Sequence, residues 1–229
     1  MWRRTFGRTL LEPAPERDHI VVRAIGQTEV ALGQKRSADY YEALLVSNFE
    51  EFQRRSRMMD NMLFLARSEH PQATIECVQL DVAGEFKRMA DYFEGLAAGR
   101  GLDFTLKGSG TVVADLILLR RALANLVSNA IQYTDSDSTI LLSSSGSEHG
   151  MTLRIENDGE AIPALQLPRL FDRFYRAGVS RRGSSQSSGL GLSIVRTIMS
   201  MHGGQGSVAS DAGKTRFSLV FPSRARGRS

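Results

Sequence analysis

Hydrophobic positions along the first third of the chain are spaced as in α-helices. From about residue 16, apolar residues recur at intervals of four and three residues until Gly33, and glycine commonly ends a helix. The segment 1–15 lacks this periodicity, and Pro13 and Pro15 break any helix there. We therefore expect an irregular N-terminus followed by a first helix.

A second helix is predicted after Ser37, which can act as its N-cap. Its apolar positions alternate between spacings of four and three residues, which is typical of a coiled coil or helical bundle. They are Leu45, Phe49, Phe52, Ser56, Met59, Leu63 and Ala66. One such seam per helix does not close a core in an antiparallel pair. We therefore expect the helical hairpin over 16–69 either to dimerise as a four-helix bundle or to pack on the rest of its own chain.

After the linker His70-Pro71-Gln72, helical and strand patterns alternate. Asp81 and Asp115 each precede an amphipathic helical pattern and can cap it. Strands are expected at Cys77 and Val78, at 102–106, at about 138–144 and 151–156, and in a hairpin around 211–213. The segment 75–222 is therefore predicted to be a layer of helices on a mixed sheet, which makes the whole chain α+β.

Composition favours a folded protein without a membrane span. Hydrophobic residues make up 41% of the 229 residues, which is enough for a core. The single cysteine, Cys77, excludes an internal disulfide and fits a reducing compartment. No apolar run approaches the roughly 20 residues needed to cross a bilayer, and the N-terminus lacks the apolar core of a signal peptide. The tail 223–229 is basic but has no interleaved aromatics, so we expect a disordered tail and no nucleic-acid partner.

Asn125 and Asn129 are the most informative polar residues in the chain. They lie four residues apart, on one face of a predicted helix whose other face is apolar. Carboxamide oxygens are neutral ligands that suit Mg²⁺. Taken alone, the pair would read as incidental polar residues on an exposed helix face. Three downstream motifs reverse that interpretation.

The three motifs are Asn157-Asp158-Gly159-Glu160-Ala161-Ile162-Pro163, Leu170-Phe171-Asp172-Arg173-Phe174-Tyr175-Arg176 and Ser188-Gly189-Leu190-Gly191-Leu192-Ser193-Ile194-Val195. With the asparagine segment, they resemble the N, G1, F and G2 boxes of the ATP-binding domain of sensor histidine kinases, a relative of the gyrase and mismatch-repair ATPases. This resemblance covers about 73–222. A weaker one over about 24–69 is to the helical hairpin of heavy-metal-sensor histidine kinases. Ile25-Gly-Gln-Thr28 and Arg57-Met-Met-Asp-Asn-Met-Leu-Phe-Leu-Ala-Arg67 carry it.

The resemblance implies that the domain binds ATP with Mg²⁺. Asn129 would supply its side-chain oxygen to Mg²⁺ with Asn125 beside it, and Tyr133 would pack against the base. Asn157 stands where the family generally has an aspartate that accepts a hydrogen bond from the adenine amino group. Its neutral oxygen can accept the same bond without charge assistance. Gln132 stands where many relatives carry a lysine or arginine that faces phosphate.

The glycines in the motifs 157–163 and 188–195 have implied roles as well. Gly159 would leave room for the base to approach the backbone, and Ala161 replaces a second glycine of the general pattern. Gly189 and Gly191 would start a helix whose bare N–H groups form an anion site for the phosphates. The remaining implied contacts to the nucleotide are Ile162, Leu190, Leu192 and Arg176. The last of these could reach phosphate or remain in solvent.

The phosphoacceptor box of the family, His-Glu/Asp-Leu-Arg-Thr-Pro, is absent. In the register set by the segment 25–28, Pro15 falls on the acceptor position and Glu16 on the acid beside it. His19 lies four residues further on and would share the same helix face. It is either a substitute acceptor or an ordinary exposed histidine. We therefore expect a chain that binds Mg·ATP but autophosphorylates poorly or not at all.

Two functions are consistent with these features. One is the cytoplasmic core of a two-component sensor kinase that signals to the receiver domain of a response regulator. The other is a non-catalytic, kinase-like dimeric module that scaffolds or regulates a response regulator or another kinase. A gyrase-type ATPase would need a glutamate in the segment 122–129, which has none. We expect a cytoplasmic location, with membrane attachment only through a sensor region upstream of this chain.

Overall fold

The computed structural model describes residues 26, 28–68, 74–148, 150–177 and 189–223. The chain divides into two compact units, residues 1–57 and 58–229, and the division falls inside the long helix α2 (Ala38–Ser68). None of the helices in the described ranges is both long enough and apolar enough to cross a membrane. The predicted irregular segment 1–15 lies outside the described residues, as does nearly all of the tail 223–229.

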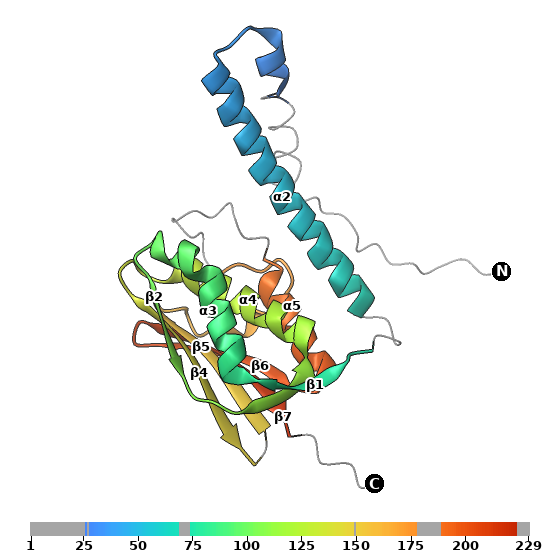
Figure 1. Ribbon diagram of the computed structural model, residues 1–229, viewed down its shortest axis with the longest axis vertical. Helices are drawn as coiled ribbons and strands as arrows, with labels where there is room; N and C mark the ends of the chain where they lie inside the picture. Colours follow the sequence, from blue (N-terminus) through green and yellow to red (C-terminus); the bar gives the residue numbers. More distant parts are fainter. Residues whose placement is uncertain (1–25, 27, 69–73, 149, 178–188, 224–229) are drawn as a thin grey trace, which may run out of the picture. The chain divides into compact units, whose positions relative to one another are not determined.

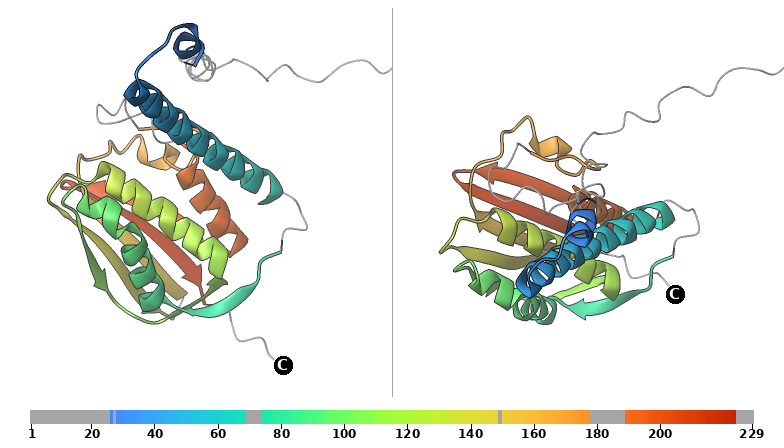
Figure 2. Two further views of the ribbon diagram at one scale, coloured as in Figure 1. Left: turned by 45° about the horizontal axis from the view of Figure 1, so that its top comes forward. Right: turned by 90° about the horizontal axis from the view of Figure 1, so that it is seen from above.

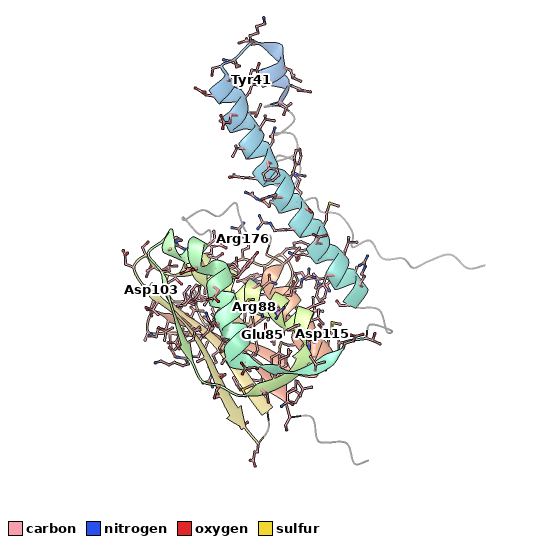
Figure 3. The ribbon with its side chains drawn as sticks, in the orientation of Figure 1. Tyr41, Glu85, Arg88, Asp103, Asp115 and Arg176 are labelled. Atoms are coloured by element: carbon pink, nitrogen blue, oxygen red, sulfur yellow. The ribbon has the colours of Figure 1, made fainter. Side chains whose placement is uncertain are left out.

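The first unit holds only part of the predicted helical hairpin over 16–69, because it ends at residue 57. Residues 28–33 are helical, and a short turn connects them to α2. The backbone N–H of Tyr40 donates to Ser37 Oγ at 3.3 Å, as predicted for the N-cap. The Tyr41 hydroxyl donates to the carbonyl oxygen of Ala31 at 3.2 Å. This contact ties the end of the first helix to the start of α2 (Figure 3).

The second unit is built on a five-stranded mixed sheet with the strand order β2-β4-β5-β7-β6. Its strands are β2 (Asp103–Lys107), β4 (Thr139–Ser147), β5 (Gly150–Asp158), β6 (Gln205–Asp211) and β7 (Lys214–Pro222). The β2–β4 pair is parallel and the other three pairs are antiparallel. The helices α3 (Val82–Ala98), α4 (Leu116–Tyr133) and α5 (Gly191–Met201) lie on one face of the sheet (Figures 1 and 2). The predicted α+β fold is confirmed.

A second, two-stranded sheet departs from the sequence-based expectation. The predicted strand at Cys77 is β1 (Cys77–Asp81), and it pairs antiparallel with β3 (Thr111–Asp115), for which no strand is predicted. The segment of β3 is short and lies between a glycine turn and a helix cap. Five residues between two such signals carry too little periodicity to identify a strand.

The core lies between the three helices and the sheet. The buried face of α4 consists of Leu119, Ala122, Leu123, Leu126, Val127, Ala130 and Ile131. Side chains of β5 and β7 such as Ile155 and Phe217 meet the helices from the sheet side and are almost fully buried. Because this apolar face anchors α4, Asn125 and Asn129 are held half-buried on the side of the helix that does not enter the core.

Polar contacts at both ends fix α4 further. Asp115 caps its N-terminus, and its Oδ1 accepts hydrogen bonds from the N–H groups of Ile117 and Leu118 at 3.0 Å. At the other end, the guanidinium of Arg100 donates to the carbonyl oxygens of Ile131 and Thr134. A cation at a helix C-terminus satisfies free carbonyls and opposes the helix dipole.

An ion pair joins α3 to α4. Arg120 donates from Nε to Glu85 Oε2 at 2.6 Å and from Nη2 to Oε1 at 2.8 Å. Arg88, one turn along α3 from Glu85, lies 3.8 Å from the same carboxylate (Figure 3). The hydrogen bonds from Arg120 hold the pKa of Glu85 below its usual value, although burial acts in the opposite direction.

Glu85→Gln is expected to lower the free energy of unfolding, because it removes the charge that Arg120 neutralises. The folded-state pKa of Glu85 lies below that of the unfolded chain, which is about 4.3. The pair therefore stabilises the fold above that pH, and the contribution is lost as the pH falls through the folded-state pKa. The difference between wild type and variant should be constant near neutrality and should shrink below about pH 4. Urea denaturation across this range measures it.

The matched control is Asp91→Asn in the same helix. Asp91 forms an ion pair with Lys87 at 3.1 Å, and both side chains are mostly exposed. An exposed pair at this spacing contributes about 0.5 kcal/mol or less, so this variant should behave almost as wild type. A difference for Glu85→Gln that grew on acidification would contradict the assignment.

Candidate functional site

The first two polar residues of the site lie where α4 meets the beginning of α5. The carboxamide of Asn125 donates from Nδ2 to the carbonyl oxygen of Arg121 at 2.8 Å. A Cβ added at Gly191 would lie only 2.8 Å from Asn125 Oδ1. Glycine therefore lets α5 approach this oxygen closely. Asn129 is one turn further along α4, and among the described residues its side chain has no hydrogen-bond partner.

The N-terminus of α5 differs from those of α3 and α4. Aspartate side chains cap α3 and α4, whereas no side chain of a described residue caps α5 at Leu190. The N–H groups in the first turn of a helix have no partner within the helix. They are positive and point outward, so the N-terminus of α5 can hold an anion beside Asn125.

Gly189 precedes α5 instead of starting it, which corrects the sequence-based expectation. Its φ of 67° is left-handed, and its carbonyl oxygen accepts a hydrogen bond from the N–H of Phe174 at 2.9 Å. A Cβ at Gly189 would come within 2.9 Å of Phe174 Cα. The third and fourth motifs are therefore joined backbone to backbone. Phe171 is buried and packs edge-to-face on Phe217, whereas Phe174 is 41% exposed with a φ of 62°.

The motif over 157–163, the second of the four along the chain, begins at the end of β5 and passes the C-terminus of α4. The Gly159 N–H donates to the carbonyl oxygen of Gly213 at 2.9 Å, and a Cβ at Gly159 would lie 2.6 Å from the carbonyl oxygen of Tyr133. Asn157, at 4% exposure, donates from Nδ2 to the carbonyl oxygen of Asp158 at 3.1 Å. Its side-chain donor is thus used locally, and its Oδ1 has no partner among the described residues.

Gln132 carries a buried donor without a partner at the end of α4. Its Nε2 makes no hydrogen bond to any described residue. A buried amide N–H of this kind is costly, and native structures usually satisfy it with water or a ligand. Tyr133, the next residue, is 42% exposed. A buried donor without a partner and an exposed ring next to the close approach of Gly159 fit a bound nucleotide.

Comparison with known proteins identifies the family of this domain. Residues 114–225 match the family described as Histidine kinase-, DNA gyrase B-, and HSP90-like ATPase. The chain contains an ATPase domain of this family. The family implies that the domain binds ATP, and all the described candidate residues lie within the matched segment.

The relatives place the chain in the heavy-metal branch of the sensor histidine kinases. It is 42% identical over 203 residues to the sensor histidine kinase CusS of Escherichia coli K12, covering 88% of this chain and 42% of CusS. It is also 42% identical over 199 residues to the sensor protein CzcS of Cupriavidus metallidurans, covering 86% of this chain and 42% of CzcS. The chain therefore spans about two fifths of the length of these curated relatives.

Solved structures show the same fold. The Acinetobacter baumannii histidine kinase AdeS matches with a TM-score of 0.74 at 20% identity, over 90% of this chain and 95% of that chain. The catalytic domain of the histidine kinase ThkA matches with a TM-score of 0.58 at 25% identity, over 65% of this chain and 96% of that chain.

The other predicted residues of the ATPase domain have different environments. Leu190 is fully buried and packs in the core, and Leu192 is half-buried. The Ile162 N–H donates to Ser210 Oγ at 2.9 Å, which fixes the loop after the second motif to β6. Ala161 is exposed. Arg176 is exposed as well (Figure 3). His19 and Glu16 lie outside the described residues.

Sequence reasoning does not identify Arg100, Ser210 or Gly213 as supports of the site. Each acts from outside the four motifs: Arg100 at the end of α4, Ser210 on Ile162 and Gly213 on Gly159. The turn signal at 211–213 predicts the hairpin that brings Gly213 into place. No local pattern predicts what that hairpin touches.

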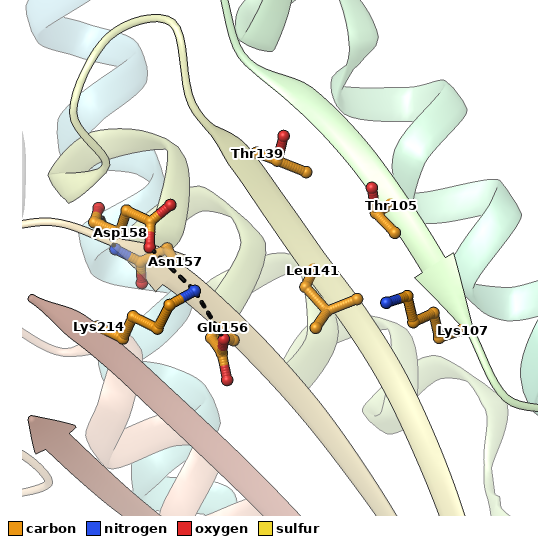
Figure 4. A pocket seen from close by; sticks show the side chains of 8 residues that line it. All are labelled: Thr105, Lys107, Thr139, Leu141, Glu156, Asn157, Asp158 and Lys214. Carbon is orange, nitrogen blue, oxygen red and sulfur yellow. Dashed lines mark hydrogen bonds and ion pairs between the residues drawn. The ribbon is translucent and has the colours of Figure 1, made fainter. Parts of the chain in front are cut away.

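A hollow lies at the sheet beside this site, and Asn157 is one of the residues that line it (Figure 4). Glu156 and Asp158 also line the hollow, and they alternate along β5 with the buried Asn157, so their side chains point away from the helices. Lys214 lies 3.2 Å from both carboxylates, and Arg216 donates to Glu156 at 2.8 Å. Burial raises the pKa of Glu156, but the hydrogen bonds from Arg216 and Lys214 outweigh it and lower the pKa overall. These charges neutralise one another.

Gly191→Ala is expected to weaken binding of a non-hydrolysable ATP analogue by about tenfold, or about 1.4 kcal/mol. The added methyl group must displace the Asn125 carboxamide or move α5 away from it. Thermal stability should change little, because alanine favours a helix. Isothermal titration calorimetry and thermal denaturation measure the two effects.

Gly95→Ala is the matched control, since Gly95 lies in α3 and a Cβ there meets nothing within 4 Å. It should stabilise the fold by about 1 kcal/mol and leave affinity unchanged. If Gly191→Ala kept full affinity, the junction of α4 and α5 would not be part of the nucleotide site.

Proposed function

We propose that this chain is the Mg·ATP-binding catalytic core of a sensor histidine kinase in which autophosphorylation is weak or absent. The observation that carries the proposal is the placement of two close approaches along the C-terminal half of α4: the N-terminus of α5 at Asn125, and Gly159 at Tyr133. The buried and unpartnered donor of Gln132 lies in the same half. Together they offer carboxamide oxygens, the N–H groups of the first turn of α5 and close backbone approach along the same half of α4.

Each residue of the site has a proposed role toward the nucleotide. Asn129, with Asn125 beside it, would hold Mg²⁺ through carboxamide oxygens, which bind a hard cation without adding charge. The N-terminus of α5 would hold phosphate oxygens. Asn157 would accept a hydrogen bond from the adenine amino group, and Tyr133 would pack against the base. Within the described ranges no cluster of three or more His, Cys, Asp or Glu could hold a metal ion.

Bound ATP would supply the γ-phosphoryl group for transfer to a neutral imidazole nitrogen. A P–N bond forms, and the P–O bond to the leaving ADP breaks. The sequence has Pro15 where the family acceptor stands, with Glu16 beside it. His19 could replace the acceptor only if its imidazole reached the same point, and phosphoryl transfer tolerates little misplacement. Weak autophosphorylation follows from this displacement.

We propose a homodimer through α2 and a response-regulator receiver domain as partner, in a cytoplasmic setting. Apolar seam residues on α2 are largely exposed: Leu45 by 68%, Phe49 by 61% and Phe52 by 63%. Large exposed apolar stripes of this kind mark interaction surfaces. A second copy would cover the stripe as a four-helix bundle does. Sedimentation equilibrium distinguishes this arrangement from a monomer.

Asn129→Asp is expected to weaken ATP binding several-fold with Mg²⁺ present and more strongly in a chelator. The added carboxylate repels phosphate, and only a bound cation can compensate for that repulsion. Calorimetric titration with and without Mg²⁺ measures both effects. Ser128→Asp adds the same charge at an exposed neighbouring position and should change affinity far less. Unchanged affinity in Asn129→Asp would remove Asn129 from the site.

Incubation with γ-labelled ATP is expected to leave little acid-labile, base-stable label on the wild-type chain. Robust label would refute the proposed impairment, and His19→Ala should then abolish it if His19 is the substitute acceptor. Pro15→His places an imidazole beside Glu16 and should gain label if only the acceptor is missing. Normal nucleotide binding without label in both the wild type and Pro15→His would favour the non-catalytic dimeric module.

A further inference from the structure

His202, at the end of α5, is a buried histidine that none of the nucleotide-binding motifs includes. Its residue exposure is 7%, and its ring packs edge-to-face on Phe221 with 5.5 Å between ring centroids. Both ring nitrogens have partners. Nδ1 lies 2.7 Å from the carbonyl oxygen of Ile198, and Nε2 lies 3.0 Å from the backbone N of Asp115.

These two contacts fix the protonation of the ring. A carbonyl oxygen can only accept a hydrogen bond, so Nδ1 must carry a proton. A backbone N–H can only donate, so Nε2 must be bare and must accept. The neutral ring with its proton on Nδ1 is the one form that satisfies both contacts. In a ring protonated on both nitrogens, the Nε2–H group would face the backbone N–H of Asp115, and neither can accept a hydrogen bond.

The Nε2 contact connects the ends of two helices that are far apart in sequence. Asp115 is the N-cap of α4 and lies 87 residues from His202, the residue after α5 (Figure 3). The same Asp115 also accepts a hydrogen bond from the N–H of Glu76 through Oδ2 at 3.1 Å. The beginning of β1, the N-terminus of α4 and the end of α5 therefore share one hydrogen-bonded junction.

The opposite end of this helix pair is the nucleotide site. Asn125 lies ten residues after Asp115, and Gly191 lies eleven residues before His202. The two helices therefore run antiparallel, with about 15 Å of helix between the junction at His202 and the contact of Gly191 with Asn125. An axial shift of α5 by one residue, about 1.5 Å, would break both contacts.

We infer that His202 is a positioning residue that sets the axial register of α5 on α4, and thereby aligns the N-terminus of α5 with Asn125. This inference rests on the proposed function, because it assigns His202 a role at the nucleotide site. His202 itself touches no nucleotide. It acts through a helix that behaves as a rigid element over its eleven residues.

Three variants separate the two hydrogen bonds. His202→Gln keeps an acceptor near the position of Nε2 and should bind an ATP analogue within about twofold of wild type. His202→Asn keeps only a donor near Nδ1, and His202→Leu removes both groups. His202→Asn and His202→Leu should each bind the ATP analogue about fivefold or more weakly than the wild type, because the loss of one hydrogen bond corresponds to about that factor in affinity. Ile140→Val is the control for a loss of stability, because it removes a buried methylene group in β4, away from His202. When each protein is measured at the same interval below its own melting temperature, this variant should bind the ATP analogue as the wild type does.

Nuclear magnetic resonance of the nucleotide-free protein tests the register independently of binding. The ¹⁵N signals of the wild-type ring should show Nδ1 protonated and Nε2 bare. His202→Asn should shift the amide signals of Gly191 and the side-chain amide of Asn125, about 15 Å away, whereas a purely local role would move only signals around the junction.

A ring protonated on Nε2, or unmoved signals at Gly191 in His202→Asn, would overturn the inference. Loss of affinity in His202→Gln equal to that in His202→Leu would do the same. If the wild type bound no nucleotide while the register signals moved as expected, the proposed function would fail and the helix register would stand.

Discussion

The antiparallel contact between α4 and α5 is the constraint on which the candidate nucleotide site depends. Neither helix makes the site alone, because α4 brings carboxamide oxygens and α5 brings bare N–H groups. The glycine at 191 lets the two approach until a side chain on it would collide with Asn125. A contact this close tolerates little axial displacement of α5 along α4. In our inference, the hydrogen bond between Asp115 and His202 at the other end of the helix pair sets that axial register.

Two groups of paired charges in the ATPase domain lie away from this contact. Glu85 pairs with Arg120 between α3 and α4, and Glu156 pairs with Lys214 and Arg216 on the far face of the sheet. Around the candidate site the polar groups are mainly amides and backbone N–H groups. Neutral groups suit a ligand that arrives with its own cation, since a fixed protein charge would have to be desolvated and would also repel one of the two ions.

Local signals made much of the fold predictable. Asp81 and Asp115 cap helices because each stands directly before an amphipathic pattern, and both the signal and its effect lie within a few residues. The same holds for the C-terminal hairpin. Contacts that cross the fold were not predictable: Arg100 reaches the end of α4 from 31 and 34 residues away, and His202 reaches Asp115 across 87. Spacing places Gly189 in a helix, but its left-handed backbone and its bond to Phe174 depend on that distant partner.

The state of the phosphoacceptor segment and the state of the ATP site are physically separable. Every described candidate residue lies in the second unit, whose hydrophobic core, over the residues that the structure describes, runs from Leu65 to Phe221. The packing that holds Asn125, Gly159 and α5 in place comes from these core residues of the second unit. Nucleotide binding depends on that packing, whereas phosphoryl transfer also needs an imidazole delivered to the γ-phosphate. A chain that lacks only the imidazole would keep the packing that nucleotide binding needs. An intact ATP site beside a missing acceptor therefore involves no physical contradiction.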